Sequence, residues 1–310
     1  MNGAEGSGRL ASVHIYPLKA GRAVDLGESV VEPWGLAGDR RWLVIDGHGR
    51  FVSQREEPSL ALVTAAYPAP GTDHAGPQPW PPADVITLSA AGQPPLTVRA
   101  PSAGDQAEMV LVAVWKSRFC AAAAGKQADG WLSHFLDRNV RLVYLDDPTR
   151  REVDQDYGAP GDRVNFADGY PLLLTSTGSL QALGRWLTDD GHEPVPMSRF
   201  RPNVVVDGTP PWAEDRWRRI RIGSVIFRVV KPCGRCQVTT IDQATAERGR
   251  QPLALLGQRR RFGQQLVFGQ NMIPDGAGSI RVGDPVQVLE RSGALFLPPE
   301  TASRTARDYF

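Results

Sequence analysis

The four residues Cys233–Cys236 (Cys-Gly-Arg-Cys) are the part of this sequence whose types and spacing most directly suggest chemistry. They follow a predicted strand, Val225–Val230, and run into Gln237–Asp242, whose β-branched residues are typical of another strand. The chain has only one further cysteine, Cys120, which excludes the disulfide framework of a small secreted protein. The chemistry of the segment must therefore come from one or two thiols.

General chemistry offers four interpretations of this thiol pair. A redox-active Cys-x-x-Cys opens a helix, whose dipole lowers the thiol pKa, whereas strand-forming residues follow here. A zinc site needs two more ligands, and the five scattered histidines supply no pair three or four residues apart. Two buried cysteines at a strand start are a common structural arrangement. The fourth is one thiolate on a soft metal carried by an organic cofactor, with Arg235 favouring the thiolate and pairing with an anionic group. Spacing alone does not establish this fourth interpretation.

Short strands and turns dominate the rest of the sequence. Glycine (32) and proline (26) together make up nearly one residue in five of the 310, well above the average of about 12%. Helical spacing of apolar residues predicts helices at Asp129–Arg138 and Ser176–Leu187. We expect a mainly β fold with a few helices (α+β), each half being a curled sheet or barrel. The predicted strands are Leu10–Tyr16, Arg41–Asp46, Arg50–Gln54, Leu60–Ala66, Val85–Leu88, Leu96–Arg99, Met109–Trp115, Val140–Leu145, Asn203–Asp207, Arg219–Ile222, Val225–Val230, Gln237–Asp242, Gln265–Phe268 and Ser279–Leu289.

Charge and composition argue against several classes of function. Lys+Arg 35 against Asp+Glu 34 leaves a formal net charge of +1, so no global field attracts nucleic acid or an anionic membrane. The N-terminus lacks a signal-peptide pattern, and no apolar run approaches the about 20 residues of a membrane span. The sequence has no P-loop, no convincing Rossmann glycine motif and no Gly-x-Ser-x-Gly nucleophile motif, so neither a nucleotide nor a flavin is expected. We therefore expect a cytoplasmic protein with a small-molecule substrate.

At the cysteine segment the sequence resembles a known family. Lys231–Asp242 (KPCGRCQVTTID) is similar to the signature of MOSC-domain proteins, named for the C-terminal domain of molybdenum cofactor sulfurase. Other segments resemble, in the same order, the amidoxime-reducing component family, in which a MOSC N-terminal β-barrel domain precedes the MOSC domain. These segments are His14–Lys19, Gly35–Trp42, Val52–Arg55, Asp168–Ser176, Phe200–Val206, Phe268–Asn271 and Val282–Val286. The resemblance thus covers most of the chain.

The resemblance implies a division into two domains. We expect the MOSC N-terminal β-barrel domain over residues 9–145 and the MOSC domain over residues 164–290. The polar, turn-rich residues 146–163 between them form a linker or an active-site loop. The remaining segments are expected to be a flexible N-terminus (1–8), an exposed proline-rich loop (67–83) and a C-terminal tail (291–310).

The resemblance also implies a molybdenum–pterin cofactor (molybdopterin) and the residues that bind it. It makes Cys236 the metal-binding and catalytic thiolate and Asp168 an acidic residue near the metal, while Cys233 falls where relatives vary. The expected cofactor-binding residues are Lys19, Arg40, Gly169, Tyr170, Arg201, Asn203 and Arg235. The fork of an arginine side chain matches phosphate oxygens in pairs, which suits this role.

Three nearby residues keep a second interpretation. Arg40 could serve only the structure of the first barrel, and Asn203 could only cap a turn. Arg55 could bind phosphate or form a salt bridge at a hairpin edge.

The activity implied by the resemblance is reduction of N-hydroxylated compounds, such as hydroxylamines, amidoximes or N-hydroxylated bases, by removal of the oxygen atom. Asp168 would orient the N–OH group or relay a proton. No cysteine follows Cys236, so no iron–sulfur cluster is expected and electrons must come from a separate ferredoxin- or cytochrome-like protein with its reductase. Two alternatives stay open: a non-catalytic carrier of the molybdenum cofactor or its sulfur, and an enzyme of specialised metabolism that uses the fold without molybdenum.

Overall fold

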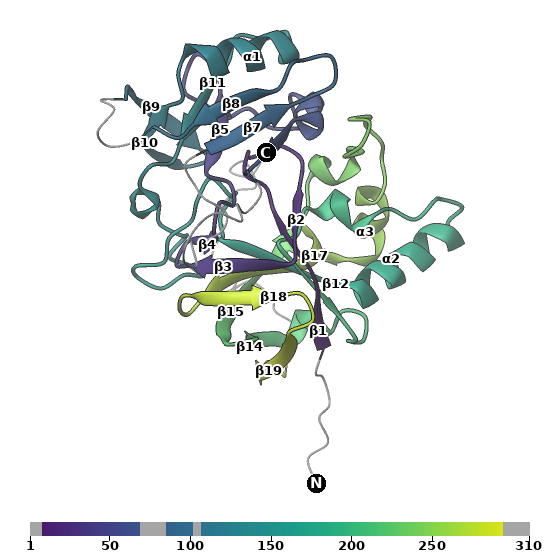
Figure 1. Ribbon diagram of the computed structural model, residues 1–310. Helices are drawn as coiled ribbons and strands as arrows, with labels where there is room; N and C mark the ends of the chain where they lie inside the picture. The colour runs from purple at the N-terminus through teal and green to yellow at the C-terminus, as the bar shows by residue number, and fades with distance from the viewer. Residues whose placement is uncertain (1–7, 69–84, 102–106, 294–310) are drawn as a thin grey trace.

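The computed structural model describes residues 8–68, 85–101 and 107–293. Within these residues the chain is mainly β, with three α-helices at the outside of its sheets (Figure 1). The fold class predicted from the sequence is therefore confirmed. The predicted flexible N-terminus, the proline-rich loop and the C-terminal tail fall almost wholly outside the described residues.

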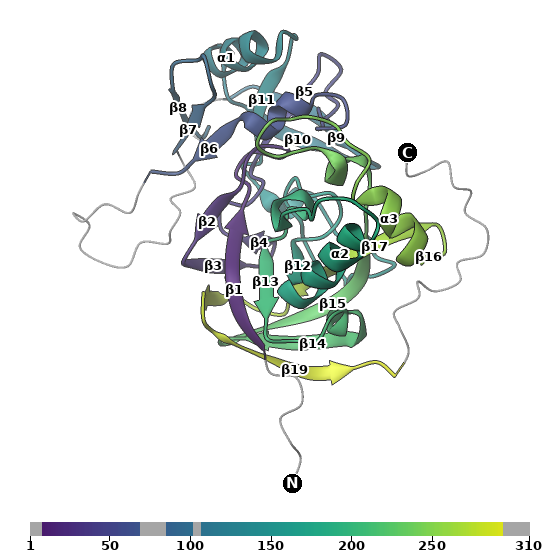
Figure 2. The same ribbon diagram turned by 90° about the vertical axis from the view of Figure 1, so that its right-hand side faces the viewer.

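Seven strands close into a barrel that forms the lower part of the molecule in Figure 1. Each strand bonds to the next around the sheet, and antiparallel pairing of β12 with β17 closes the ring. In spatial order the barrel strands are β12 (Leu172–Ser176), β13 (Val204–Asp207), β1 (Gly8–Ile15), β19 (Pro285–Arg291), β14 (Trp217–Ile222), β15 (Val225–Gly234) and β17 (Gln265–Pro274). The first strand of the chain thus belongs to a barrel otherwise built from residues 172–291 (Figure 2).

The upper part of the molecule in Figure 1 is an open four-stranded sheet with one smaller sheet beside it. The four strands, in order, are β5 (Trp42–Ile45), β11 (Arg141–Tyr144), β10 (Ser117–Ala123) and β9 (Met109–Val114). The smaller sheet is formed by β6 (Thr64–Ala66), β7 (Val85–Ser89) and β8 (Leu96–Arg99). A second small sheet, formed by β18 (Gly278–Arg281), β3 (Glu28–Glu32) and β4 (Gly35–Leu36), lies against the barrel, with β18 next to β15 (Figure 1). Two short strands join these sheets at their edges, β2 (Val24–Leu26) beside β1 and β16 (Arg261–Phe262) beside β17. We call the part containing β5 to β11 the N-terminal unit.

Three helices cover the sheets. In α1 (Lys126–Leu136), Ala128, Trp131 and Leu132 recur at helical spacing and are buried, which explains why this face packs on the N-terminal unit. The other two, α2 (Thr177–Asp189) and α3 (Leu253–Arg259), lie outside the barrel (Figure 2). Of the helices in the described residues, none is both long and apolar enough to cross a membrane.

Four strands predicted from the sequence differ in the structure. Ser279–Leu289 is divided by a turn at residues 282–284 into β18 and β19, which belong to different sheets. Gln237–Asp242 instead forms a short 3-10 helix, η5 (Gln237–Thr240), because both the amide and the hydroxyl of Thr239 donate to the carbonyl of Cys236. Leu60–Ala66 divides into the 3-10 helix η1 (Pro58–Leu62) and β6. Arg50–Gln54 contributes only isolated bridges beside β5 and β9. In each case a local turn overrides the β propensity of the side chains.

A buried acidic side chain ties α2 to the barrel. Glu214 lies in η4 (Ala213–Arg216) and is fully buried. Its carboxyl group accepts hydrogen bonds from Ser179 Oγ at 2.6 Å and from Ser176 Oγ at 3.1 Å. Burial raises the pKa of Glu214 to about 7; the neighbouring Asp215 adds to this rise, while the serine hydroxyls oppose it.

We expect this carboxyl group to make the stability of the protein depend on pH. Between its ordinary pKa of 4.5 and about 7, the folded state alone keeps a proton on Glu214, so the free energy of unfolding falls as pH rises. The loss amounts to about 2–3 kcal/mol from about pH 5 to about pH 8. Glu214→Gln should flatten this part of the profile when urea unfolding is measured across that range. If the free energy of unfolding falls equally steeply with pH in the two proteins, Glu214 is already ionised in the folded protein at about pH 5.

Candidate functional site

Side chains that are far apart in the sequence converge where the N-terminal unit meets the barrel. The N-terminal unit supplies Arg55 and Trp115, and the ends of barrel strands supply most of the others. The residues that form this site, which we call the interdomain site, are Lys19, Arg40, Arg55, Trp115, Asp168, Arg201 and Cys236. Five of them, all but Arg55 and Trp115, are residues that the family resemblance predicts for catalysis or cofactor binding.

Cys236 presents a half-buried thiol at the end of β15. Its Sγ lies 3.4 Å from both Nε and Nη2 of Arg55, whose guanidinium group lies 4.6 Å from the ring centre of Trp115. Phosphate binding and a hairpin-edge salt bridge were the two roles predicted for Arg55, and its guanidinium group lies beside this sulfur.

The two neighbouring cysteines differ in their surroundings. Cys233 and Cys236 are both free thiols. The Sγ of Cys233 contacts the carbonyl of Gly234 at 3.8 Å, and burial raises the pKa of this thiol despite the nearby Arg235. Of the two sulfur atoms, that of Cys236 is the one in contact with Arg55.

Asp168 offers a carboxylate at the rim of the site. Its Oδ1 accepts hydrogen bonds from Lys19 Nζ at 2.5 Å and from Trp115 Nε1 at 3.2 Å, and 67% of the side chain remains exposed. The surrounding protein raises the pKa of this carboxyl group, but the ammonium of Lys19 outweighs that effect and holds the pKa well below its usual range. Burial in turn lowers the pKa of Lys19 to about 8, against the opposing charge of Asp168.

Arg151 holds the loop that carries Asp168, and no sequence signal pointed to it. Its buried side chain lies in the segment predicted as a linker or active-site loop. It donates to the backbone carbonyl of Asp168 at 2.8 Å, to that of Asn165 at 2.6 Å, and also to that of Ala167. Burial lowers the pKa of Arg151 to about 10.

Two arginines share one tyrosine ring behind the site. The guanidinium groups of Arg40 and Arg201 lie 4.5 Å and 4.2 Å from the ring centre of Tyr16. Both arginines have positive φ, +47° and +54°, a conformation that costs energy in any residue other than glycine. Burial lowers the pKa of Arg201 to about 10, and repulsion from Arg40 contributes.

The site holds more positive than negative charge. Among the described residues, Lys19, Arg40, Arg151 and Arg201 share only two neighbouring carboxylates, those of Asp39 and Asp168. Buried charge without a counterion is costly. An anionic group bound here would therefore be stabilised by several cations at once.

The other predicted cofactor-binding residues mainly contact the protein itself. Asn203 accepts from Arg40 Nη1 at 2.9 Å and from the amide of Leu173, and it donates to the carbonyl of His14. Asn203 is therefore a buried residue whose side chain links β12 and β1 by hydrogen bonds, rather than a turn cap. Tyr170 packs its ring edge against Tyr157 at 6.4 Å. The preceding Gly169 has open space where a side chain would extend.

Two of the three guanidinium nitrogens of Arg235 donate hydrogen bonds to backbone carbonyl groups. Nε donates to the carbonyl of Phe268 at 2.8 Å and Nη1 to that of Phe200 at 3.1 Å. Nη2 is buried and has no partner among the described residues. One charged donor of this residue thus lacks a hydrogen-bond partner in the described part of the chain.

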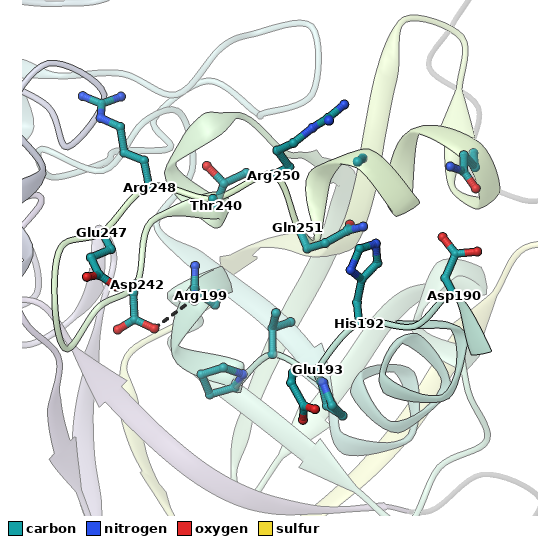
Figure 3. Close-up of a pocket in the computed structure, with 16 residues that line it drawn as sticks. Asp190, His192, Glu193, Arg199, Thr240, Asp242, Glu247, Arg248, Arg250 and Gln251 are labelled. Atoms are coloured by element: carbon teal, nitrogen blue, oxygen red, sulfur yellow. Dashed lines mark hydrogen bonds and ion pairs between the residues drawn. The ribbon is translucent and has the colours of Figure 1, made fainter. Parts of the chain in front are cut away.

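A separate pocket of about 760 Å³ lies next to the interdomain site, between the loop after α2 and the segment from η5 to α3 (Figure 3). Arg199 and Asp242 form an ion pair of 2.9 Å in its wall. Arg248, another lining residue, donates to the backbone carbonyl of Arg55. None of the predicted site residues lines this pocket, although its Thr240 belongs to the same 3-10 helix that begins after Cys236.

A zinc site formed by amino-acid side chains finds no support. In residues 8–68, 85–101 and 107–293, no group of three or more His, Cys, Asp or Glu side chains could hold a metal ion.

Both halves of the chain match known domains. Residues 7–139 match the MOSC N-terminal beta barrel domain and residues 161–287 match the MOSC domain. Mitochondrial amidoxime-reducing component 1 of Homo sapiens is 30% identical over 303 residues, covering 91% of this chain and 83% of that protein. The chain belongs to the amidoxime-reducing component family. Its Mus musculus relative of the same name is 31% identical, with 91% and 82% covered.

This family member also matches other proteins. Molybdenum cofactor sulfurase of Homo sapiens is 27% identical over 284 residues, which is 86% of this chain but 31% of that protein. Among solved structures, the YUAD protein from Bacillus subtilis is 10% identical with a TM-score of 0.38, covering 91% of this chain and 94% of that one. The family predicted from the ordered motifs is confirmed by these domain matches and relatives.

Proposed function

We propose that this protein is a molybdenum cofactor-dependent reductase that removes the oxygen atom from N-hydroxylated compounds. The observation that carries the proposal is the convergence of one accessible thiol, one rim carboxylate and a surplus of buried cations in the interdomain site. The names of the relatives, which are amidoxime-reducing components and molybdenum cofactor sulfurases, support the same chemistry.

The residues of the site fit a molybdenum–pterin group. A thiolate suits a soft metal, so Cys236 would bind molybdenum. The pterin and its phosphate are anionic, and Lys19, Arg40 and Arg201 supply the charge that would hold them. The buried, unpartnered Nη2 of Arg235 is a further donor that such an anion would satisfy.

The bound group would supply the redox chemistry, in which an N–OH group, two electrons and two protons give N–H and water. The protein positions the substrate and its protons. Asp168 remains ionised near neutral pH, so its exposed oxygen accepts a hydrogen bond from the N–OH group. Lys19 Nζ, with a pKa of about 8 and a hydrogen bond to Asp168 Oδ1, provides a proton beside that carboxylate. The indole of Trp115 keeps the carboxylate in place from the other side.

The proposal is tested on protein purified with its native metal content. We expect roughly one molybdenum and one pterin per chain, and conversion of benzamidoxime to benzamidine with reduced methyl viologen as electron donor. N-hydroxylated bases and hydroxylamine complete the substrate panel. Protein that carries the cofactor but reduces none of these compounds would be a carrier module, and protein without molybdenum would be an enzyme of another kind. Either result overturns the proposal.

A further inference from the structure

A strip of exposed apolar side chains follows β9 on the outer face of the N-terminal unit. Met109 is 45% exposed, Leu111 is 59% exposed and Trp115 is 37% exposed. Met109 and Leu111 lie two positions apart in β9, so they share one side of the β9–β10 hairpin. Trp115 follows in the turn of the hairpin, where its ring packs against Phe51. Only two other large apolar side chains in the described residues, Val282 and Leu289, are comparably exposed, and they lie in another part of the fold. Exposed apolar side chains grouped in this way mark an interaction surface.

Positive charge borders this strip. Arg118 is exposed and pairs across the hairpin with Ala113, so it projects from the same face as Leu111. Lys116 is exposed in the turn of the hairpin. At the far end of the strand the acidic Glu108 is already bound by Arg141 at 2.6 Å. The face therefore presents an apolar centre with a basic border, which we call the hairpin face.

Trp115 connects the hairpin face to the interdomain site. Its ring contacts the guanidinium group of Arg55, which lies 3.4 Å from Cys236 Sγ. Its indole nitrogen donates to Asp168 at 3.2 Å. The backbone of Trp115 has φ of +54°, a costly conformation for a bulky residue that persists only where the surroundings enforce it. One exposed aromatic side chain thus reaches from the hairpin face to a side chain that touches the sulfur.

We propose that the hairpin face is the docking surface for a small acidic one-electron carrier protein and that electrons enter the site at Trp115. This inference rests on the proposed function. Reduction of one N–OH group to N–H and water consumes two protons and two electrons, and each reduced carrier gives up one electron. The carrier stays a separate protein, oxidised once at each encounter.

The hairpin face has the size and composition of a transient contact. The six residues of β9 that lead from Met109 to the hairpin turn span about 20 Å. Weak electron-transfer encounters bury less than about 1,200 Å² and have a charged border around an apolar centre. Arg118 and Lys116 would steer an acidic partner to this face and orient it, which raises the association rate at low ionic strength.

The test compares protein donors with a small donor on the same variants. The protein donors are an acidic [2Fe–2S] ferredoxin and an acidic cytochrome b5, each kept reduced by its reductase, and the small donor is reduced methyl viologen. In Lys116→Glu/Arg118→Glu we expect the KM for a protein donor to rise at least about tenfold, and the wild-type rate to fall as salt screens the charges. The rate with methyl viologen should stay within about twofold of wild type, a change no larger than that of a neutral surface substitution.

Two further variants separate charge from apolar contact. Leu111→Asp should raise the KM for the protein donor, because it places a charge in the apolar centre. Arg185→Glu is the matched control, since Arg185 is exposed on α2, on the other side of the molecule from the β9–β10 hairpin (Figure 1). Calorimetric titration of oxidised carrier into each protein gives a binding readout that does not depend on turnover.

Several outcomes would overturn the docking proposal. One is a KM for the protein donor that changes as much in the control as in the hairpin variants, and another is a KM that does not change in the hairpin variants. A third is an enzyme that turns over with methyl viologen but accepts electrons from neither protein donor. If the wild-type protein is a dimer and Leu111→Asp is a monomer, the hairpin face binds a second copy of the chain instead of a carrier protein. Loss of turnover with methyl viologen in the wild type, by contrast, would overturn the proposed function itself.

Discussion

Replacing Cys236 by Ser is expected to remove both molybdenum and reductase activity from the protein while leaving its fold intact. A serine hydroxyl is not ionised near neutral pH and is a poor ligand for a soft metal, unlike a thiolate. Changes to the outer partners of a metal ligand already cost about 10–100-fold, so loss of the ligand itself should lower kcat/KM by more than about 100-fold. Metal analysis and benzamidoxime reduction with methyl viologen measure the two losses.

The matched control for this variant is Cys233→Ser. The thiol of Cys233 makes its hydrogen-bond contact with the backbone of Gly234, whereas Arg55 contacts the thiol of Cys236. The molybdenum content and rate of Cys233→Ser should therefore stay close to those of wild type. The Sγ of Cys236 makes no capping hydrogen bond to η5, so Cys236→Ser should change the free energy of unfolding by no more than about 0.5 kcal/mol. A Cys236→Ser protein with full metal content and full rate would contradict the assignment of the metal ligand.

Residues of the interdomain site could be predicted from the sequence only where they lie in motifs of the family. Spacing alone left four interpretations of Cys236, and the resemblance selected it together with Asp168 and Lys19, which the structure brings into one site. Arg55 lies 181 positions from Cys236 and contacts its sulfur, and no local pattern encodes such a contact. The same holds for Arg151, whose role depends on the backbone of Asp168 rather than on any motif.

The fold was predictable to the extent that local patterns determine it. Strands such as β15 alternate buried and half-buried residues from Val225 to Val230, and this period is visible in the sequence. The pattern shows that a strand has a buried face but not which strand lies beside it. For this reason the placement of β1 between β13 and β19 of the distant barrel was not foreseen. Gln237–Thr240 was mistaken for a strand because a hydroxyl-to-backbone bond, which propensity does not describe, stabilises the 3-10 turn.

A buried ion pair behind the interdomain site is expected to contribute more to stability than any exposed pair. Asp215 Oδ2 lies 2.7 Å from Arg260 Nη2, and Oδ1 accepts from Gln270 Nε2 at 2.8 Å. Both charged side chains are buried, and Arg260 also lies 4.2 Å from the ring centre of Trp212. The pair links η4 to the start of β17, because Arg260 Nε also donates to the carbonyl of Val267.

Asp215→Asn should lower the free energy of unfolding by about 3–5 kcal/mol, because it leaves the guanidinium of Arg260 buried without a counterion. This loss is a large part of the free energy of unfolding of a typical protein, which is about 5–15 kcal/mol. The neighbouring β17 carbonyls of Leu266 and Phe268 hold Arg235, so the position of Cys236 should loosen as well. Urea unfolding measures the first effect, and the rate of Cys236 alkylation in the folded protein measures the second.

Two comparisons determine whether the buried charge is the cause. Glu28→Gln breaks the exposed pair with Arg281 and should lower the free energy of unfolding far less than Asp215→Asn, because water and salt screen exposed charges. The double variant Asp215→Leu/Arg260→Met removes both charges and fills their volume, so it should recover most of the lost stability. If Asp215→Asn does not fold, the double variant still tests the explanation. A double variant that also fails to fold would show that side-chain shape and hydrogen bonds, and not an unpaired charge, determine the stability of this region. A cost for Asp215→Asn no greater than that of Glu28→Gln would show that the ion pair does not hold β17 in place.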